Sequence, residues 1–179
     1  MTTYVALLRG VNLGSHNKVP MAHLRQSLGE GGLDDVRTYI QSGNVVFRSS
    51  AGAVQVETTI ENVIAQRFGL DVRVLVRTDA ELVAVLAGNP FAAAQPDQTK
   101  LHVVFLSESP DPAKVAALEA RHDGAEAFAV SGRDVYLHTP DGLGRARLTH
   151  ASFEKAFGLA ATARNWRTVN RLAEMAAGG

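Results

Sequence analysis

Hydrophobic residues along this chain occur in short runs and at helical spacing, and the two patterns alternate. Short apolar runs bounded by turn-forming residues predict strands, whereas apolar positions three and four residues apart predict helices. The first run, residues 4–8, is too short for an ordinary helix and is followed by Arg9-Gly10. It therefore predicts a strand buried at the centre of a sheet, around which the other strands assemble.

The first half of the chain predicts two helices and four strands. A hairpin is expected in the middle, because Ser42-Gly43-Asn44 contains the small and left-handed-tolerant residues of a tight turn. The predicted elements are strand 4–8, helix 21–28, strands 36–41 and 45–48, helix 56–68 and strand 72–76. Their order is βαββαβ.

The middle of the chain predicts a connection. Thr78 and Glu81 have the spacing of a capping box, which opens a short helix through residue 86. Gly88-Asn89-Pro90 ends that helix, and residues 92–98 have no period. We therefore expect a first module over residues 1–78, a helix and linker over 79–100, and a second module over 101–179.

The second half repeats the order of the first. It predicts strand 101–106, a helix opened by Pro110 and Pro112, strands 127–130 and 135–138, a helix from Thr149, a short strand 160–163 and a terminal helix 166–173. Both hairpin turns contain a Ser-Gly pair, at 42-43 and 131-132. We expect these pairs to be equivalent when residues 3–77 are superposed on residues 101–164. The sequence thus predicts an α+β fold with duplicated ferredoxin-like βαββαβ modules, antiparallel sheets of strand order 4-1-3-2, and an extra C-terminal helix.

Composition excludes several classes of site. The 179 residues include no cysteine, which rules out disulfides, thiolate nucleophiles and zinc ribbons. The six histidines never pair at metal-ligand spacing, so we expect neither a metal nor another cofactor. No segment approaches the roughly 18 apolar residues of a membrane helix, and the N-terminus lacks the pattern of a signal peptide. A cytoplasmic protein without membrane contact, monomeric or weakly homodimeric, is expected.

Charge is balanced overall but unevenly distributed. Residues 1–50 carry five basic and three acidic side chains, residues 51–139 seven and twelve, and residues 140–179 six and three, which gives +2, −5 and +3. Two basic ends that met in space would form a local positive surface on a neutral protein.

Polar and basic residues near the predicted strand ends are candidates for binding an anion. Asn165 has the right chemistry to cap the terminal helix, and a helix start flanked by arginines attracts anions. The candidates are Arg9, Asn12, Asn17, Lys18, Gln41, Ser42 and Asn44 in the first module, and Arg145, Arg147, Thr149, Arg164, Asn165, Trp166 and Arg167 in the second. We expect the two groups to line one cleft, with Lys18 facing Arg164.

Simpler interpretations of these residues stay open. The loop to Lys18 can be an ordinary strand-to-helix connection with a solvated lysine. Trp166, the only tryptophan, can stack on a flat ligand or can be a core residue that starts an apolar stripe. The arginines can be solvated.

Three segments resemble a bacterial family catalogued as domain of unknown function 1697 (DUF1697). They are Tyr4-Val-Ala-Leu-Leu-Arg-Gly-Val-Asn with Lys18-Val-Pro-Met21, Thr38-Tyr-Ile-Gln-Ser-Gly-Asn-Val-Val-Phe47, and Thr162-Ala-Arg-Asn-Trp-Arg-Thr-Val169. The resemblance extends over nearly the whole chain and implies a duplicated ferredoxin-like arrangement; it implies no activity. This chain departs from the family pattern at Ala146-Arg147-Leu148-Thr149, where a lysine is common, and at Gly14-Ser15-His16. A lysine-specific role at residue 147 therefore does not transfer.

Three functions are compatible with these patterns. The basic ends favour a module that binds a phosphate-bearing ligand, either a nucleotide or a nucleic acid. A small enzyme acting on a phosphorylated metabolite is the first alternative, although no general base is evident. A structural or regulatory domain that uses an exposed sheet edge is the second.

Overall fold

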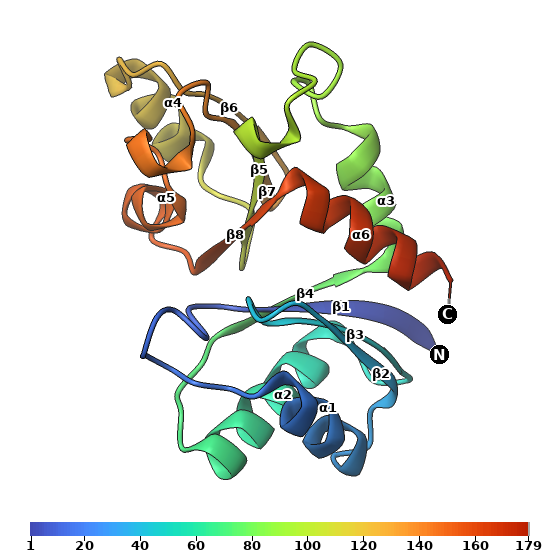
Figure 1. Ribbon diagram of the computed structural model, residues 1–179. Coiled ribbons are helices and arrows are strands. Elements are labelled where there is room, and N and C mark those ends of the chain that lie inside the picture. The colour runs from blue at the N-terminus through green and yellow to red at the C-terminus, as the bar shows by residue number, and fades with distance from the viewer. Residues whose placement is uncertain (179) are drawn as a thin grey trace. The chain divides into compact units, whose positions relative to one another are not determined.

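The computed structural model describes residues 1–178, which form two compact α+β units (Figure 1). The first unit comprises Met1–Val83 together with the C-terminal segment from Arg171, and the second comprises Ala84–Asn170. Each unit contains one four-stranded antiparallel sheet. The predicted α+β class is confirmed.

The first sheet has the strand order β2-β3-β1-β4, which is the predicted 4-1-3-2 arrangement. Helices α1 and α2 cover one of its faces (Figure 1). The elements are β1 (Thr2–Leu8), α1 (Met21–Glu30), β2 (Asp34–Tyr39), β3 (Asn44–Ser49), α2 (Ala53–Phe68) and β4 (Val74–Thr78). Helix α3 (Asp79–Ala87) follows β4, and the division between the two units falls within it.

The core of this unit forms because alternate strand residues face the same side of a sheet. Leu8 and Phe47 from the strands pack with Leu28 of α1 and with Ile60 and Ile64 of α2, and all five are fully buried. On the opposite face of β1, Val5 and Leu7 are equally buried. The first apolar run is therefore a central strand covered on both faces, as its continuous hydrophobicity predicted.

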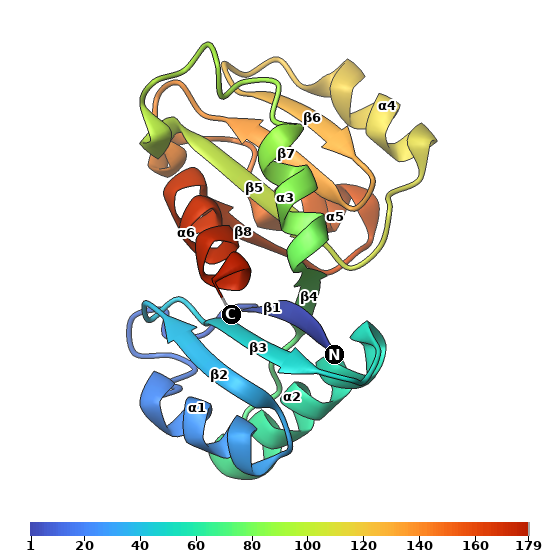
Figure 2. The same ribbon diagram turned by 90° about the vertical axis from the view of Figure 1, so that its right-hand side faces the viewer.

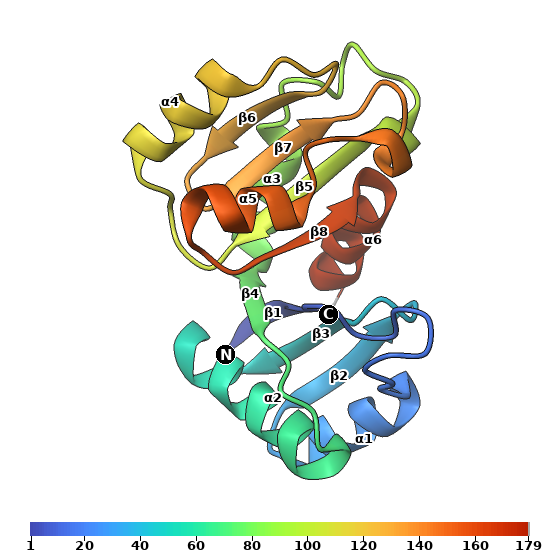
Figure 3. The ribbon, with the colours of Figure 1, turned by 90° about the vertical axis from the view of Figure 1, so that its left-hand side faces the viewer.

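The second sheet has the order β6-β7-β5-β8, so its topology is again 4-1-3-2 (Figure 2). Helices α4 and α5 cover one face (Figure 3), where Leu118, Phe153 and Phe157 pack on Val104 and Leu137. The elements are η1 (Gln98–Lys100), β5 (Leu101–Leu106), α4 (Pro112–Arg121), β6 (Ala127–Ser131), β7 (Asp134–His138), η2 (Leu143–Arg145), α5 (His150–Phe157), β8 (Ala161–Asn165) and α6 (Trp166–Ala177).

Both hairpin turns differ from the prediction. Strand β2 ends at Tyr39, which pairs with Asn44, so the first loop is residues 40–43 and Asn44 is a strand residue. The loop lengthens because Ile40 adopts a left-handed φ of 49° and turns the chain before Gln41. In the second hairpin Ser131 pairs with Asp134, which leaves only Gly132-Arg133 as the loop.

The Ser-Gly pairs of the two turns are not equivalent. The amide of Leu8 donates to the carbonyl oxygen of Gly43, and the amide of Leu106 donates in the same way to Arg133. Gly43 therefore matches Arg133, and the two Ser-Gly pairs are displaced by one residue. The expectation that they superpose is wrong, because loops of different length reach the same strand pairing.

Strand pairing matches other residues of the two units. Tyr4 pairs with Thr78 at one edge of the first sheet, and His102 pairs with Asn165 at the corresponding edge of the second. Strand β8 thus runs on to Asn165, two residues beyond the predicted end, and leads directly into α6. Tyr4 corresponds to His102, and Thr78 corresponds to Asn165.

Candidate functional site

A hollow of about 220 Å³ lies at the start of α6, within the second unit. Its lining side chains come from η1, from the beginning of β5, and from the junction of β8 and α6. They are Gln98, Thr99, His102, Asn165 and Arg167. All five are polar, and none carries a carboxylate.

Asn165 caps the helix that opens on this hollow, as the sequence predicted. Its Oδ1 accepts a hydrogen bond from the backbone amide of Thr168, at 2.8 Å. The first backbone amides of a helix have no acceptor within the helix, so those of Trp166 and Arg167 add to a positive helix end. No acidic residue stands in the first turn of α6.

The helix that follows the fourth strand of the other sheet is α3. The positive charge at its start is neutralised by acidic side chains of the helix itself. Helix α3 follows β4 and carries Asp79 and Glu81 in its first turn. Glu81 accepts from the amide of Thr78 at 2.8 Å and donates its own amide to the Thr78 hydroxyl at 3.1 Å, which confirms the predicted capping box. In α6 the equivalent positions are Trp166 and Thr168, so the positive end has no internal counter-charge.

His102 is the most buried of the lining residues, with 5% of its surface exposed. Its Nε2 lies 3.2 Å from the hydroxyl oxygen of Thr139. Burial lowers the pKa of His102 from its ordinary value, so the ring is neutral at pH 7. Sequence reasoning missed this residue, although a histidine inside the apolar run 101–106 was a detectable signal.

The neighbours of Asn165 in the sequence do not face the hollow. Arg164 is buried, and its Nη1 donates to the Thr162 hydroxyl at 2.8 Å and to the Ala163 carbonyl at 2.9 Å. Burial lowers the pKa of Arg164 to about 10, which still leaves it charged at neutral pH. Trp166 is only 6% exposed, so it has the position of a core residue.

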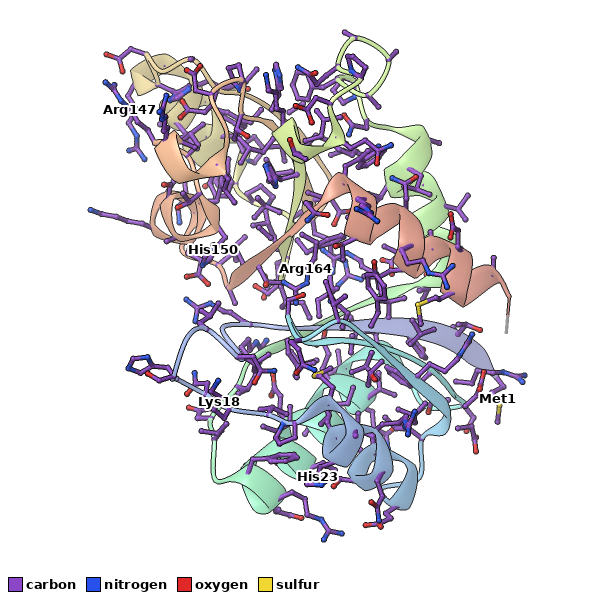
Figure 4. All side chains as sticks on the ribbon, viewed as in Figure 1. Met1, Lys18, His23, Arg147, His150 and Arg164 are labelled. Carbon is purple, nitrogen blue, oxygen red and sulfur yellow. The ribbon has the colours of Figure 1, made fainter. Side chains whose placement is uncertain are left out.

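Arg147 lies at a different hollow, between α4 and α5. This second hollow measures about 420 Å³ and is lined by Leu118, Arg121, His122, Asp123, Arg147, Leu148, Ser152 and Lys155. Figure 4 shows Arg147 well apart from Arg164 on β8. Within the second unit, Arg145, Arg147 and Arg167 therefore line different hollows, so the expected single cleft does not bring them together.

Carboxylates hold the loop that carries Arg147. Its Nη1 forms an ion pair with Asp123 Oδ1 at 2.8 Å, and its backbone amide donates to Glu126. Burial raises the pKa of the Glu126 carboxyl. Hydrogen bonds from the backbone amides of Arg147 and of Glu126 itself, together with the charges of His122 and Arg147, lower this pKa overall. Arg145 lines a crevice of about 10 Å³ beside Glu126, and Thr149 caps α5.

In the first unit, two of the asparagines that we expected to bind a ligand instead form hydrogen bonds that stabilise loops. Asn12 Nδ2 donates to the carbonyl oxygens of Val19 and Gln41, at 2.9 and 2.7 Å, and Asn12 Oδ1 accepts from the Val19 amide at 2.8 Å. Asn44 is fully buried and donates to Tyr39 O and to the Ser42 hydroxyl.

The remaining first-unit candidates surround the same loop. Asn17 donates to the carbonyl oxygen of Gly10 at 3.0 Å, and the amide of Arg9 donates to Arg73 O. Lys18 and Gln41 are exposed. The cleft that would join these residues to the second module stays a prediction.

Residues 1–178 contain neither a candidate membrane-spanning helix nor a candidate metal site. No helix there combines the length and hydrophobicity needed to cross a membrane. Nor do the described histidine, aspartate and glutamate side chains gather in groups of three that could hold a metal ion.

Comparison with known proteins finds a matching family model and a similar solved structure. The family model described as "Protein of unknown function (DUF1697)" matches residues 1–136. The structure of a conserved bacterial protein, SP0830 from Streptococcus pneumoniae, is similar at 26% sequence identity with a TM-score of 0.76, and the match covers 99% of both chains. No curated protein matches. The chain therefore belongs to the DUF1697 family, as its sequence motifs indicated.

Proposed function

We propose that the hollow at the start of α6 binds the phosphate group of a small molecule. The observation that carries this proposal is the contrast between two equivalent helix starts. The start of α3 has Asp79 and Glu81 as its own anions, whereas the start of α6 has Arg167 and a carboxylate-free hollow. An anion from solution would supply the missing negative charge.

The lining groups suit a phosphate. The guanidinium of Arg167 and the free amides of the first helical turn are donors, and a hydrogen bond to a charged group contributes about 1.5 to 3 kcal/mol. The helix dipole adds roughly 0.3 to 1 kcal/mol for an anion at this position. The neutral His102 adds no charge at the hollow, so the positive charge there comes from Arg167 and the helix end.

The size of the hollow favours a small ligand over a nucleic acid. Pockets for drug-sized ligands usually measure about 300 to 1,000 Å³, and this one measures about 220 Å³. A phosphate monoester with a short organic part matches that volume. A nucleic-acid strand would need an extended groove with repeated positive charge.

Calorimetric titration with inorganic phosphate and n-propyl phosphate at low salt tests the proposal. Arg167→Ala should weaken binding by about 1.5 to 3 kcal/mol, the contribution of one charged hydrogen bond. Arg171→Ala is the matched control, because Arg171 lies on the same helix but pairs with Glu174 at 2.9 Å. Binding that is unchanged in Arg167→Ala, or no binding by the wild-type protein, would overturn the proposal.

A further inference from the structure

The edge strand β6 of the second unit carries none of the features that keep another strand away. Among the described strands it pairs with β7 alone, and Figure 3 shows it at the outer edge of the sheet. Its residues, Ala127–Ser131, include no charged side chain and no proline, and their register with β7 runs through the whole strand without a shift. A regular, uncharged edge is a template on which another strand can pair.

The corresponding edge strand of the first unit is protected. Strand β2 carries Asp34, Asp35 and Arg37, and its register with β3 shifts between Asp34 and Arg37. Asp35 adopts a left-handed φ of 48°, and its Oδ2 lies 3.2 Å from Nη2 of Arg37. Charges and irregular pairing on an edge strand oppose the addition of another strand. The unprotected edge is therefore a property of β6 and is not shared by the two units.

Hydrogen bonds beside the two ends of β7 show in which direction its residues bond. The amide of Leu106 donates to the carbonyl oxygen of Arg133 at 2.8 Å, and the amide of Thr139 donates to that of Lys100 at 2.9 Å. Both bonds lie on the β5 side, and the direction alternates from residue to residue along an antiparallel ladder. Residues 135 and 137 therefore bond to β5, and residues 134, 136 and 138 bond to β6.

The same alternation leaves the backbone groups of two β6 residues free. Ala127, Ala129 and Ser131 pair with residues 138, 136 and 134, so they direct their N–H and C=O groups to β7. Phe128 and Val130 direct theirs away from the sheet, and no other backbone group within residues 1–178 bonds to them. Two donors and two acceptors thus lie along the outer edge of β6.

We propose that β6 pairs in antiparallel orientation with β6 of a second copy of this chain, with Ala129 of both copies at the twofold axis. In this register the N–H and C=O groups of Phe128 bond to those of Val130 in the second copy, and symmetry repeats the same pair. All the free donors and acceptors of both edges are then used. The two four-stranded sheets become one continuous sheet.

The side chains beside this edge fit the same arrangement. Phe128 and Val130 both pack at the margin of the core under α4 and α5, where they are half-buried. The pairing places Phe128 of one copy next to Val130 of the other on the helix-covered face. It therefore removes more apolar surface from water and forms two aromatic to β-branched cross-strand pairs.

The charges at the two ends of β6 are complementary. The segment before the strand carries Asp123 and Glu126, and the turn after it carries Arg133. Antiparallel pairing about Ala129 sets Arg133 opposite Ala125 of the second copy, between the two carboxylates. Opposite charges across an interface favour one partner and one orientation. The chain's own β6 segment thus carries charges that match this edge, which is the reason for assigning the edge to a second copy.

Sedimentation equilibrium of the full chain, up to millimolar protein concentration, tests the pairing. The wild-type protein should dimerise. Val130→Pro should weaken dimerisation about tenfold, because proline removes an outward N–H and with it two hydrogen bonds between the copies. An outward N–H on an edge strand bonds to no other strand of its own sheet, so the variant should still fold.

Thr38→Pro is the matched control. Thr38 lies in the edge strand β2 between Arg37 and Tyr39, which pair with Val46 and Asn44 of β3, so its N–H also points outward. This variant should dimerise like the wild-type protein. A wild-type protein that stays monomeric at millimolar concentration would overturn the inference, and so would equal dimerisation of Val130→Pro.

Disulfide trapping tests the register without a proline. The sequence contains no cysteine, so Ala129→Cys introduces a single thiol. Opposed residues of a non-hydrogen-bonded antiparallel pair have Cα atoms about 4.5 Å apart, which is within disulfide range. Ala129→Cys should therefore form a covalent dimer with oxidised glutathione. Ser131→Cys is the control, because the two residues 131 would lie about 13 Å apart along the strands. No trapping at residue 129, or equal trapping at both positions, would overturn the inference.

Discussion

Arg77 and Arg164 occupy the same position in the two sheets, one residue before the end of the fourth strand. Arg77 pairs with Val5 and Arg164 with Val103, and the two arginines are 1% and 7% exposed. Each Nη1 donates to the carbonyl oxygen of the preceding residue, at 3.0 and 2.9 Å. The two units therefore match in a buried cation as well as in topology, which supports the predicted duplication.

Replacing Arg164 should destabilise the fold. Arg164→Ala removes two described hydrogen bonds and the packing of a buried side chain, so we expect the free energy of unfolding to fall by about 2 to 4 kcal/mol. Urea denaturation measures the change. Arg147→Ala is the control, because its exposed ion pair with Asp123 contributes about 1 kcal/mol or less. Equal effects of the two substitutions would contradict the buried role of Arg164.

Acid should destabilise the native protein through His102. The folded protein lowers the pKa of this residue, so on acidification the unfolded chain takes up the proton first. The contribution of His102 to stability is fully present above about pH 6.5 and is lost as the pH falls from there toward the lowered pKa.

Unfolding experiments between pH 7.5 and 5 check this prediction. His102→Gln should lose stability less steeply than the wild-type protein over that range. His23→Gln, which changes an exposed histidine of α1, is the control and should follow the wild-type curve. If His102→Gln shows the wild-type pH dependence, the assignment to His102 is wrong.

Gly43 should tolerate no side chain. A Cβ atom there would lie 2.5 Å from Val11 Cγ2 and 2.8 Å from Leu8 Cβ, and the φ angle is +83°. Gly43→Ala should therefore lower the free energy of unfolding by about 2 kcal/mol or more, the sum of backbone strain and a steric clash. Gly132→Ala has a φ of +57° but open space around it, so we expect only about 1 kcal/mol. Thermal unfolding of the two variants should show the difference.

Asn12 should affect stability more than ligand binding. Asn12→Asp keeps the shape of the side chain but replaces its Nδ2 donor by an oxygen. That oxygen faces the two carbonyl oxygens that accept hydrogen bonds from Asn12 in the wild-type protein. The expected loss is about 2 to 3 kcal/mol of unfolding free energy, since two acceptors lose their donor and a charge faces them. Differential scanning calorimetry gives the measurement. A variant as stable as the wild-type protein would instead favour the original interpretation of Asn12 as a ligand contact.

The sequence by itself determined the order and type of the elements. Apolar runs of strand length and apolar positions at helical spacing are local signals, and they led to the 4-1-3-2 topology found in both sheets. The capping roles of Thr78 and Asn165 could also be predicted, because a cap bonds to amides only three residues away.

Only the tertiary structure decided which polar residues meet. Arg164 and Arg167 are three positions apart, yet one is buried and the other lines the hollow, because the chain changes from strand to helix between them. His102 contacts Thr139 and pairs with Asn165, and both of these residues are distant from it in the sequence. Residues far apart along the chain meet through strand pairing, and a shift of one residue in a strand turns every side chain to the other face.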